Sequence, residues 1–370
     1  MAEENSTNSP LYHYHTLSEV LKSPKTALTA VFLILLMLCT LVGNFLVIWT
    51  IFTTRRLRFS AFFFVASLAV ADFLVGLVVL PISLAYHLTF EMTGRWILGS
   101  FTCKAWLLFN FWFCSASVLN LCLVSWDRYV AVTSPLHYKA HMSDTRVRKM
   151  IIISWTLSFS LSIILIAKAN SSIDKRTNCT IHRIEDVPFA VCGVLLVFLI
   201  PVIFLIFVNG RVWITARRHK KRITAVEDSM RLSFSNNWNR NLESRNSIDN
   251  CPILTLDSRG RSASGILNQI NNKSSNSERG GKKLTRTIKQ EIKTFKTFLI
   301  VIGVFVVFWC PFYVSMLVDI VNKFSSFVFY ITIVLGYCNS AMNIFIYGVF
   351  NREFRKAMIT SLKCCRVETF

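Results

Sequence analysis

Seven long apolar blocks dominate this sequence of 370 residues and limit the folds that it can adopt. Each block is near or above the ~20 residues that an α-helix needs to cross a hydrocarbon core of ~30 Å. With 53% hydrophobic residues, the chain is too apolar for an ordinary soluble domain. The blocks cover residues 26–54, 60–88, 100–132, 148–168, 187–217, 292–320 and 326–349. The sequence therefore predicts an all-α membrane protein built as a bundle of seven transmembrane helices.

The basic residues, which give the chain a net charge of +21, indicate its orientation in the membrane. They cluster after the first, fifth and seventh blocks and before the fourth, all on one side of the predicted bilayer. Cytoplasmic loops carry an excess of lysine and arginine, so we expect the N-terminus outside the cell and the C-terminus in the cytoplasm. This topology explains the basic balance without a nucleic-acid partner.

The segments before and between the blocks set the predicted domain organisation. Residues 1–25 form a polar extracellular N-terminus without a signal-peptide pattern, and Asn5 heads a sequon for N-glycosylation. Residues 26–219 hold the first five transmembrane helices with their loops, and residues 285–350 hold the last two.

Two polar segments complete this organisation. Residues 220–284 are rich in Ser, Asn and Arg and lack hydrophobic periodicity, so we expect a disordered third cytoplasmic loop. Residues 351–370 begin with an amphipathic stretch, which predicts a cytoplasmic eighth helix followed by a tail. Cys364 and Cys365 lie beside basic residues in this stretch, a setting that favours reversible palmitoylation.

Polar residues inside the predicted spans are the sharpest functional signal, because each costs on the order of several kcal/mol in hydrocarbon unless it finds a partner. They occur in four spans: Asn44, Asp72, Ser117, Asn339, Ser340 and Asn343. Ordinary interhelical hydrogen bonding explains one or two such residues well and the whole set poorly. The sequence Asp127-Arg128-Tyr129 adds an acid–base pair at the edge of the third block, where a membrane protein can keep a switch.

The third block, from Cys103 to Val132 with its Asp127-Arg128-Tyr129 sequence, resembles the third helix of rhodopsin-like G-protein-coupled receptors. The sixth block contains VFVVFWCPFY at 304–313, which is similar to the family's sixth helix with its core Phe, switch Trp and kink Pro. The resemblance extends over all seven spans and the eighth helix. It is strongest to the receptors for biogenic and trace amines, as in NREFRKA at 351–357.

This resemblance implies a plasma-membrane receptor that converts binding of an extracellular small, amine-like ligand into activation of a heterotrimeric G protein. Arrestin and receptor kinases would be further partners. It also implies a disulfide between Cys103 and Cys179, which pins the second extracellular loop over the mouth of the bundle. The family's switch residues correspond here to Asp127, Arg128, Tyr129, Glu291 and Tyr347, with an ion pair between Arg128 and Glu291 that holds the bundle closed.

Two internal sites are implied in the same way. Asp72, Ser117, Asn339 and Asn343 would line a water-filled pocket that holds a sodium ion in the resting state, and no other metal site is expected. The residues that the resemblance places around the ligand are Asn110, Phe111, Cys114, Gly193, Val194, Val197, Trp309, Phe312, Tyr313, Phe329, Ile333 and Tyr337.

Several of these positions depart from the family pattern. Asn110, seven residues after Cys103, stands where amine receptors place the aspartate that binds the ligand ammonium. Its amide can hydrogen-bond an ammonium or a hydroxyl but lacks the charge-assisted part, about 1–2 kcal/mol. Ile344 replaces the usual proline of the seventh span, and Asn209 stands where a tyrosine is usual. We expect the energetics of activation to differ from those of the family.

Other classes fit less well. An enzyme needs a converging set of titratable groups, and inside the spans Asp72 is almost alone. A transporter usually has paired broken helices in related halves, and this sequence has no such symmetry. An opsin needs a lysine in the seventh span, and residues 326–349 contain none. A receptor for peptides or other non-amine ligands remains the alternative, because Asn110 removes the main argument for an amine.

Overall fold

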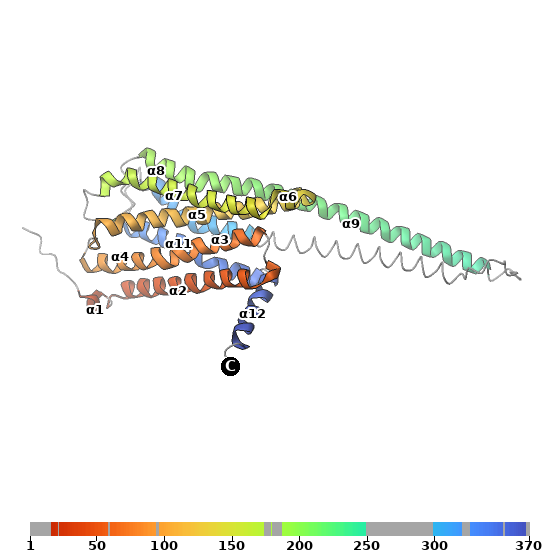
Figure 1. Ribbon diagram of the computed structural model, residues 1–370, viewed down its shortest axis with the longest axis horizontal. Coiled ribbons are helices and arrows are strands. Elements are labelled where there is room, and N and C mark those ends of the chain that lie inside the picture. Colours follow the sequence, from red (N-terminus) through yellow and green to blue (C-terminus); the bar gives the residue numbers. More distant parts are fainter. Residues whose placement is uncertain are drawn as a thin grey trace, which may run out of the picture. The chain divides into compact units, whose positions relative to one another are not determined.

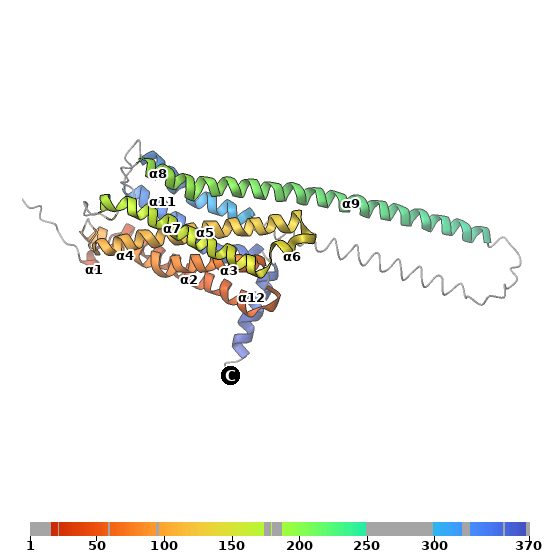
Figure 2. The same ribbon diagram turned by 45° about the horizontal axis from the view of Figure 1, so that its top comes forward.

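The helical bundle predicted from the sequence is present in the computed structural model. The structure describes residues 16–20, 22–57, 60–93, 96–173, 179, 187–248, 299–319, 326–350 and 352–367. Within these ranges every regular element is a helix, and seven helical segments are long and apolar enough to cross a membrane. In the unit formed by residues 1–209 and 297–370 they run side by side (Figures 1 and 2). The predicted fold class is therefore confirmed.

The observed spans follow the predicted blocks closely. The first four are α2 (Pro24–Thr53), then α3 (Ser60–Leu74) continued by η2 (Val75–Val79) and α4 (Leu80–Thr93), then α5 (Gly99–Thr133), then α7 (Asp144–Ile173). The last three are α8 (Val187–Val194) with η4 (Leu195–Leu199) and α9 (Ile200–Ile248), the segment Leu299–Asp319, and α11 (Ser326–Phe350). Short elements lie outside the spans: α1 (Leu17–Val20), η1 (Arg55–Leu57), η3 (Pro135–His137), α6 (Tyr138–His141) and α12 (Arg352–Val367).

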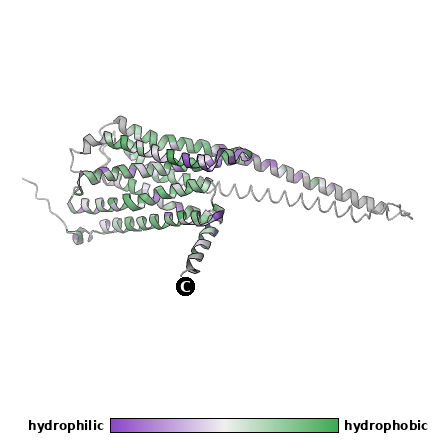
Figure 3. Ribbon diagram, in the orientation of Figure 1, coloured by the Kyte–Doolittle hydropathy of each residue, from purple (hydrophilic) through white to green (hydrophobic). Residues whose placement is uncertain are grey.

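Apolar residues make up most of each span, as the colour of the ribbon in Figure 3 shows, and they occupy both buried and exposed positions. In α2, Leu33 and Val47 are buried against neighbouring helices, whereas Leu28 and Val42 are exposed. A soluble protein would place polar side chains at such exposed positions, but in a bilayer these surfaces face lipid chains. Packing between the helices therefore depends on close contacts and on the few internal polar groups.

Two spans contain a π-helical turn just before a proline. The turn η2 precedes Pro81, and η4 precedes Pro201 in the fifth span. Proline has no N–H to donate, so the carbonyls of the preceding turn rearrange to i→i+5 bonding. This local unwinding changes the direction in which the preceding residues, including Val194 and Val197, face the bundle.

The structure differs from the predicted third loop, because α9 stays helical through Ile248. Low hydrophobicity prevents residues 220–248 from burying a core, but it does not prevent helix formation. No glycine or proline occurs between Gly210 and Pro252, and most residues there have good or tolerable helix propensity. Residues 249–284 of the predicted loop lie outside the described residues.

The predicted eighth helix is present as α12, which turns away from the end of α11 (Figures 1 and 2). Its Phe354 is fully buried and stacks on Phe62 at 6.5 Å between ring centroids. The Ser361 hydroxyl lies 3.1 Å from the Thr53 hydroxyl at the end of α2. These contacts fasten α12 to the bundle, and both Cys364 and Cys365 fall within this helix.

Candidate functional site

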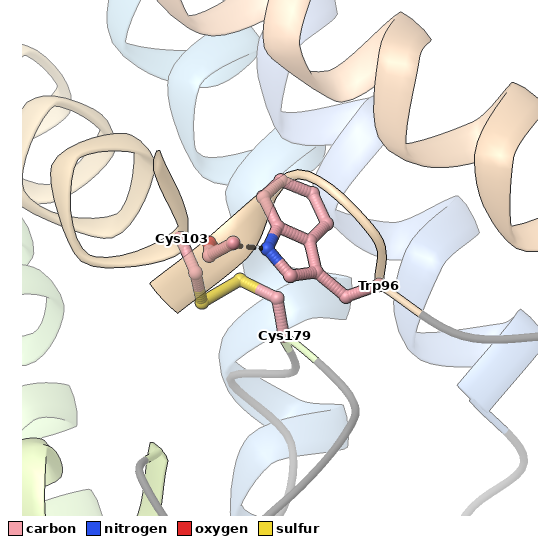
Figure 4. The surroundings of a disulfide bond; sticks show 4 residues. Trp96, Cys103 and Cys179 are labelled. Carbon is pink, nitrogen blue, oxygen red and sulfur yellow. Dashed lines mark hydrogen bonds between the residues drawn. A yellow bond between two sulfur atoms is a disulfide. The ribbon is translucent and has the colours of Figure 1, made fainter. Parts of the chain in front are cut away.

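The predicted disulfide closes one end of the bundle, here called the disulfide end. Cys103 in the first turns of α5 is bonded to Cys179, and their Cα atoms lie 5.7 Å apart. Figure 4 shows Trp96 beside this bond, with its indole N–H donating to the Gly99 carbonyl at 2.7 Å. Gly99 has a φ of 81°, a conformation that glycine adopts without strain, and it begins α5. The predicted disulfide is thereby confirmed.

Asn110 lies two helical turns beyond Cys103 and is buried, with 4% of its surface exposed. The Cys114 thiol, one turn further along α5, donates to the Asn110 side-chain oxygen at 3.7 Å. On the opposite side of the predicted ligand site, Gly193, Val194 and Val197 are also buried and offer no hydroxyl. This region of the bundle therefore contains an uncharged amide where an amine receptor would hold a carboxylate.

Aromatic rings pack into a continuous network in the same part of the bundle. Phe312 contacts Trp309 at 5.8 Å, Tyr313 at 5.2 Å and Phe329 at 5.2 Å between ring centroids. Four of the predicted ligand residues are thus brought together from the sixth span and α11. Ring faces carry partial negative charge, so such a network can hold a cation or an aromatic ligand.

The remaining predicted ligand residues also lie in the packed interior. Ile333 and Tyr337 are buried on α11, and Phe111 and Cys114 are partly buried on α5. The Tyr337 hydroxyl is buried without a hydrogen-bond partner among the residues that the structure describes. The contact of these four residues with a ligand stays a prediction.

Asp72 lies at the centre of a hydrogen-bonded network deeper in the bundle. Its carboxylate is fully buried and accepts hydrogen bonds from Ser117 Oγ at 3.2 Å and Ser340 Oγ at 2.7 Å, and from Asn343 Nδ2. A buried carboxylate surrounded by hydroxyl and amide groups is the donor set that a hard cation such as sodium prefers. The residues present therefore fit the predicted sodium site.

The residues that hydrogen-bond to Asp72 differ from the predicted set. Asn339 is buried, but among the described residues it makes no hydrogen bond to Asp72, whereas its neighbour Ser340 does. Adjacent residues of an α-helix point about 100° apart, so a one-residue difference decides which side chain faces the network. Asn44 Nδ2 also donates to the Ser340 carbonyl at 2.9 Å and ties α2 to α11 at this level.

A second charged cluster lies at the end of α5 opposite to the disulfide. Arg128 and Asp127 form an ion pair, and Arg128 Nε donates to Asp127 Oδ2 at 3.0 Å. The Tyr138 hydroxyl of α6 donates to the other carboxylate oxygen at 2.7 Å. Burial and the Asp127 charge raise the pKa of Tyr138, so its phenol stays protonated and keeps donating. This arrangement holds Arg128 against its own helix.

The structure describes the other predicted switch residues only in part. Tyr129 stacks on Trp126 at 5.3 Å between ring centroids. Tyr347 lies on α11 with its backbone described, and Glu291 lies outside the described residues, as does Asn5. The predicted ion pair between Arg128 and Glu291 therefore stays a prediction.

Comparison with known proteins decides the family. Residues 43–347 match the family described as 7 transmembrane receptor (rhodopsin family). The chain belongs to this family. Similar relatives are the 5-hydroxytryptamine receptors 1B of Vulpes vulpes, with 32% identity over 348 residues, and of Homo sapiens, with 31% identity over 348 residues. Each alignment covers 92% of this chain and 88% of the relative. The family and these relatives are receptors and not enzymes.

Three residues of this receptor were missed by the sequence prediction. Ser340 is not among the residues predicted to hold sodium, and Tyr138 lies in a short helix with no hydrophobic pattern of its own. Phe198 stacks on Tyr313 at 4.5 Å between ring centroids and closes the aromatic network from the fifth span. Only Ser340 had a usable signal, because it is one of the polar residues inside the predicted spans.

Gly336 sets how closely Trp309 approaches α11 in the receptor. A Cβ atom at this position would lie 2.9 Å from two carbons of the Trp309 ring. We expect Gly336→Ala to displace this ring and to lower the stability of the receptor by about 1–3 kcal/mol, as overpacking does. Thermal unfolding of the purified receptor measures this loss.

Gly303→Ala in the sixth span is the matched control, because a Cβ there meets no atom within 4 Å. Since alanine favours helix more than glycine does, this control should unfold at the same or a higher temperature. Equal unfolding temperatures for the two variants would show that Trp309 is not closely packed on Gly336.

Proposed function

We propose that this receptor binds a small aromatic, amine-like ligand at Asn110 and the aromatic network and activates a heterotrimeric G protein at the opposite end of the bundle. The observation that carries the proposal is the buried Asn110 in a receptor whose family relatives are named 5-hydroxytryptamine receptors. Those names favour an amine-like ligand over the peptide alternative. The disulfide end would then face the outside of the cell, as the distribution of basic residues predicts.

The uncharged Asn110 changes how such a ligand would be held. A ligand nitrogen can hydrogen-bond the amide, and its charge can rest on the ring faces of Trp309 and Phe312. Without a carboxylate the site loses about 1–2 kcal/mol of charge-assisted binding. We therefore expect a weak or absent response to simple primary amines such as histamine, serotonin, dopamine and tyramine.

Signalling would begin when Arg128 leaves Asp127 and the sixth helix moves away from the bundle. In the resting state Glu291 would restrain Arg128 as well, and Tyr347 would join the active arrangement. The basic end of the fifth helix, including Arg217 and Arg218, suits a negatively charged cytoplasmic surface. We further propose arrestin and receptor kinases as partners, glycosylation at Asn5, and palmitoylation at Cys364 and Cys365.

Sodium would act from the Asp72 network as an allosteric ion of the resting state. The Asp72 carboxylate and the hydroxyl oxygens of Ser117 and Ser340 would hold the ion, with Asn343 orienting the carboxylate. A cation that binds one state better than another shifts the equilibrium toward that state. Ligand affinity should therefore depend on sodium through this network.

Asp72→Asn should abolish this dependence because it removes the negative charge that the ion requires. In wild-type receptor, replacing choline chloride by sodium chloride at equal ionic strength should raise the unfolding temperature by a few degrees, roughly 1 kcal/mol of linkage. The variant should show no difference between the two salts. A sodium effect of the same size in both proteins would contradict the site.

A ligand screen tests the proposed function as a whole. Cells expressing the full chain are exposed to biogenic amines, their neutral analogues and short peptides, and cyclic nucleotide and calcium are recorded together. The proposal predicts responses to neutral or substituted aromatic amines and none to peptides. Responses confined to peptides would overturn it.

A further inference from the structure

A cluster of aromatic rings and unpaired polar atoms lies next to the candidate ligand site, toward the disulfide end. It is made of Ser83 and His87 on α4, Trp106 on α5 and Tyr330 on α11, joined by the ring of Tyr86. Tyr86 lies 5.7 Å from Trp106 and 5.9 Å from Tyr330, and His87 stacks on Tyr330 at 5.4 Å, all between ring centroids. We call these five residues the aromatic–polar cluster.

Four polar atoms of this cluster are buried and make no well-aligned hydrogen bond among the described residues, although the hydroxyls of Ser83 and Tyr330 lie close enough to interact with each other. They are Ser83 Oγ, His87 Nε2, Trp106 Nε1 and Tyr330 Oη. Ser83 is fully buried, Trp106 is 4% exposed and His87 is 8% exposed. A buried polar group that lacks a partner costs free energy, so a protein keeps several together only where something else satisfies them.

The hydrogen-bonding capacity of the cluster defines what could satisfy it. The indole N–H of Trp106 can only donate, and the hydroxyls of Ser83 and Tyr330 can both donate. None of these donors is charged, so they suit a neutral carbonyl oxygen better than a carboxylate, which would lose its hydration without gaining a counter-charge. The cluster therefore offers several uncharged donors to a neutral acceptor.

The cluster is continuous with the site around Asn110. Trp106 precedes Asn110 by one helical turn on the same face of α5, a rise of about 6 Å. Tyr330 directly follows Phe329, which belongs to the aromatic network. A ligand seated at Asn110 would reach the cluster with a short substituent on its nitrogen.

Building on the proposed function, we propose that the ligand is an N-acylated aromatic amine whose carbonyl oxygen is bound by the aromatic–polar cluster. Acylation turns the amine into a neutral amide, and an amide N–H is the natural partner of the Asn110 side-chain oxygen. The missing carboxylate at Asn110 and the unpaired donors beyond it then have one explanation. The aromatic ring of the ligand rests in the network of Trp309 and Phe312.

The experiment compares tryptamine, N-acetyltryptamine and tryptophan on the full-length receptor. Binding is measured as the shift in unfolding temperature of the purified receptor, and signalling as G-protein activation in cells. N-acetyltryptamine should act at concentrations about tenfold or more below those of tryptamine, the effect of at least one added hydrogen bond. Tryptophan, which carries a carboxylate, should be the weakest.

Two variants test the donors. Tyr330→Phe removes one donor and keeps the ring, whereas Trp106→Phe removes one donor and leaves a smaller ring. Each should reduce the advantage of N-acetyltryptamine about fivefold or more while leaving the tryptamine response unchanged. Tyr330→Phe should leave the unfolding temperature of the ligand-free receptor unchanged or raise it, because it deletes a buried hydroxyl and keeps the ring. Trp106→Phe should lower it, because the smaller ring leaves a cavity. Loss of ligand affinity in Tyr330→Phe without loss of ligand-free stability distinguishes a binding role from a purely structural one.

Trp112→Phe is the matched control. Trp112 also buries an unpaired indole N–H, but it packs against Phe159 at 4.6 Å and Trp155 at 6.0 Å, on the side of α5 that faces α7. This variant should lose ligand-free stability as Trp106→Phe does, without changing the preference for N-acetyltryptamine. A reduced preference in Trp112→Phe equal to that in Trp106→Phe would overturn the assignment.

The remaining outcomes also decide the proposal. Equal or greater potency of tryptamine or tryptophan, or no thermal shift with N-acetyltryptamine, would overturn the acyl-amine assignment while leaving G-protein activation by the receptor intact. A thermal shift with N-acetyltryptamine but no activation of any G protein would instead count against the proposed function and leave the assignment standing.

Discussion

Cys103→Ala and Cys179→Ala should each remove most of the receptor from the cell surface. The disulfide joins residues 76 positions apart, and it tethers Cys179 to the first turns of α5. Loss of a native disulfide over such a long loop typically costs about 2–5 kcal/mol and leaves a reactive partner thiol. Surface labelling of intact cells measures the folded fraction, and thermal unfolding measures the stability of what remains.

Two comparisons separate this effect from a general sensitivity to cysteine loss. Cys39 and Cys192 are exposed and unbonded, so Cys39→Ala and Cys192→Ala should express normally. The double variant Cys103→Ala with Cys179→Ala should be no worse than either single one, since both remove the same bond. Normal surface expression and signalling in both single variants would show that the disulfide does not support the fold.

Asn110→Asp should create a response to simple primary amines in a receptor that otherwise responds to them weakly or not at all. The new carboxylate would add a charge-assisted hydrogen bond to an ammonium next to the ring faces of Trp309 and Phe312. Such a bond is worth about 1–2 kcal/mol or more, which corresponds to roughly tenfold or greater potency. Concentration–response curves for tyramine and serotonin, corrected for surface expression, measure this gain.

The main physical risk of this substitution is an unpaired buried carboxylate, which protonates or destabilises the fold when no cation is bound. Asn120→Asp on the same helix controls for it, because Asn120 is equally buried and has an unpaired side-chain oxygen. This control should gain no amine response. A well-expressed Asn110→Asp receptor that ignores every amine, or a wild-type receptor activated by micromolar serotonin or dopamine, would contradict the account of Asn110.

The bundle could be predicted from the sequence because its signal is long and repetitive. Each span is a block of apolar residues whose length is fixed by the bilayer, so errors at the ends leave the fold unchanged. The disulfide could be predicted because Cys103 and Cys179 occupy positions at which the resemblance implies a bonded pair. These features depend on where residues lie along the chain and not on the direction in which their side chains point.

Side-chain direction explains what could not be predicted. Ser340 rather than Asn339 faces Asp72, a choice made by the exact rotation of α11 at that level. Tyr138 reaches Asp127 from a four-residue helix, whose position no periodicity encodes. The extension of α9 over residues 220–248 could not be predicted for a different reason. Composition indicates whether a segment can bury apolar side chains, but this part of α9 forms a helix without a buried core of its own.

Basal nucleotide exchange on purified heterotrimeric G proteins tests the central claim most directly, namely that this chain is a signalling switch held closed at Arg128. Wild-type receptor, Glu291→Ala and the double variant Arg128→Ala with Glu291→Ala are compared in lipid nanodiscs. The account predicts that Glu291→Ala raises basal exchange about fivefold with at least one G-protein family, which corresponds to an ion pair worth about 1 kcal/mol. The double variant should return to background. A Glu291→Ala receptor that reaches the surface yet raises exchange with no G-protein family would contradict it.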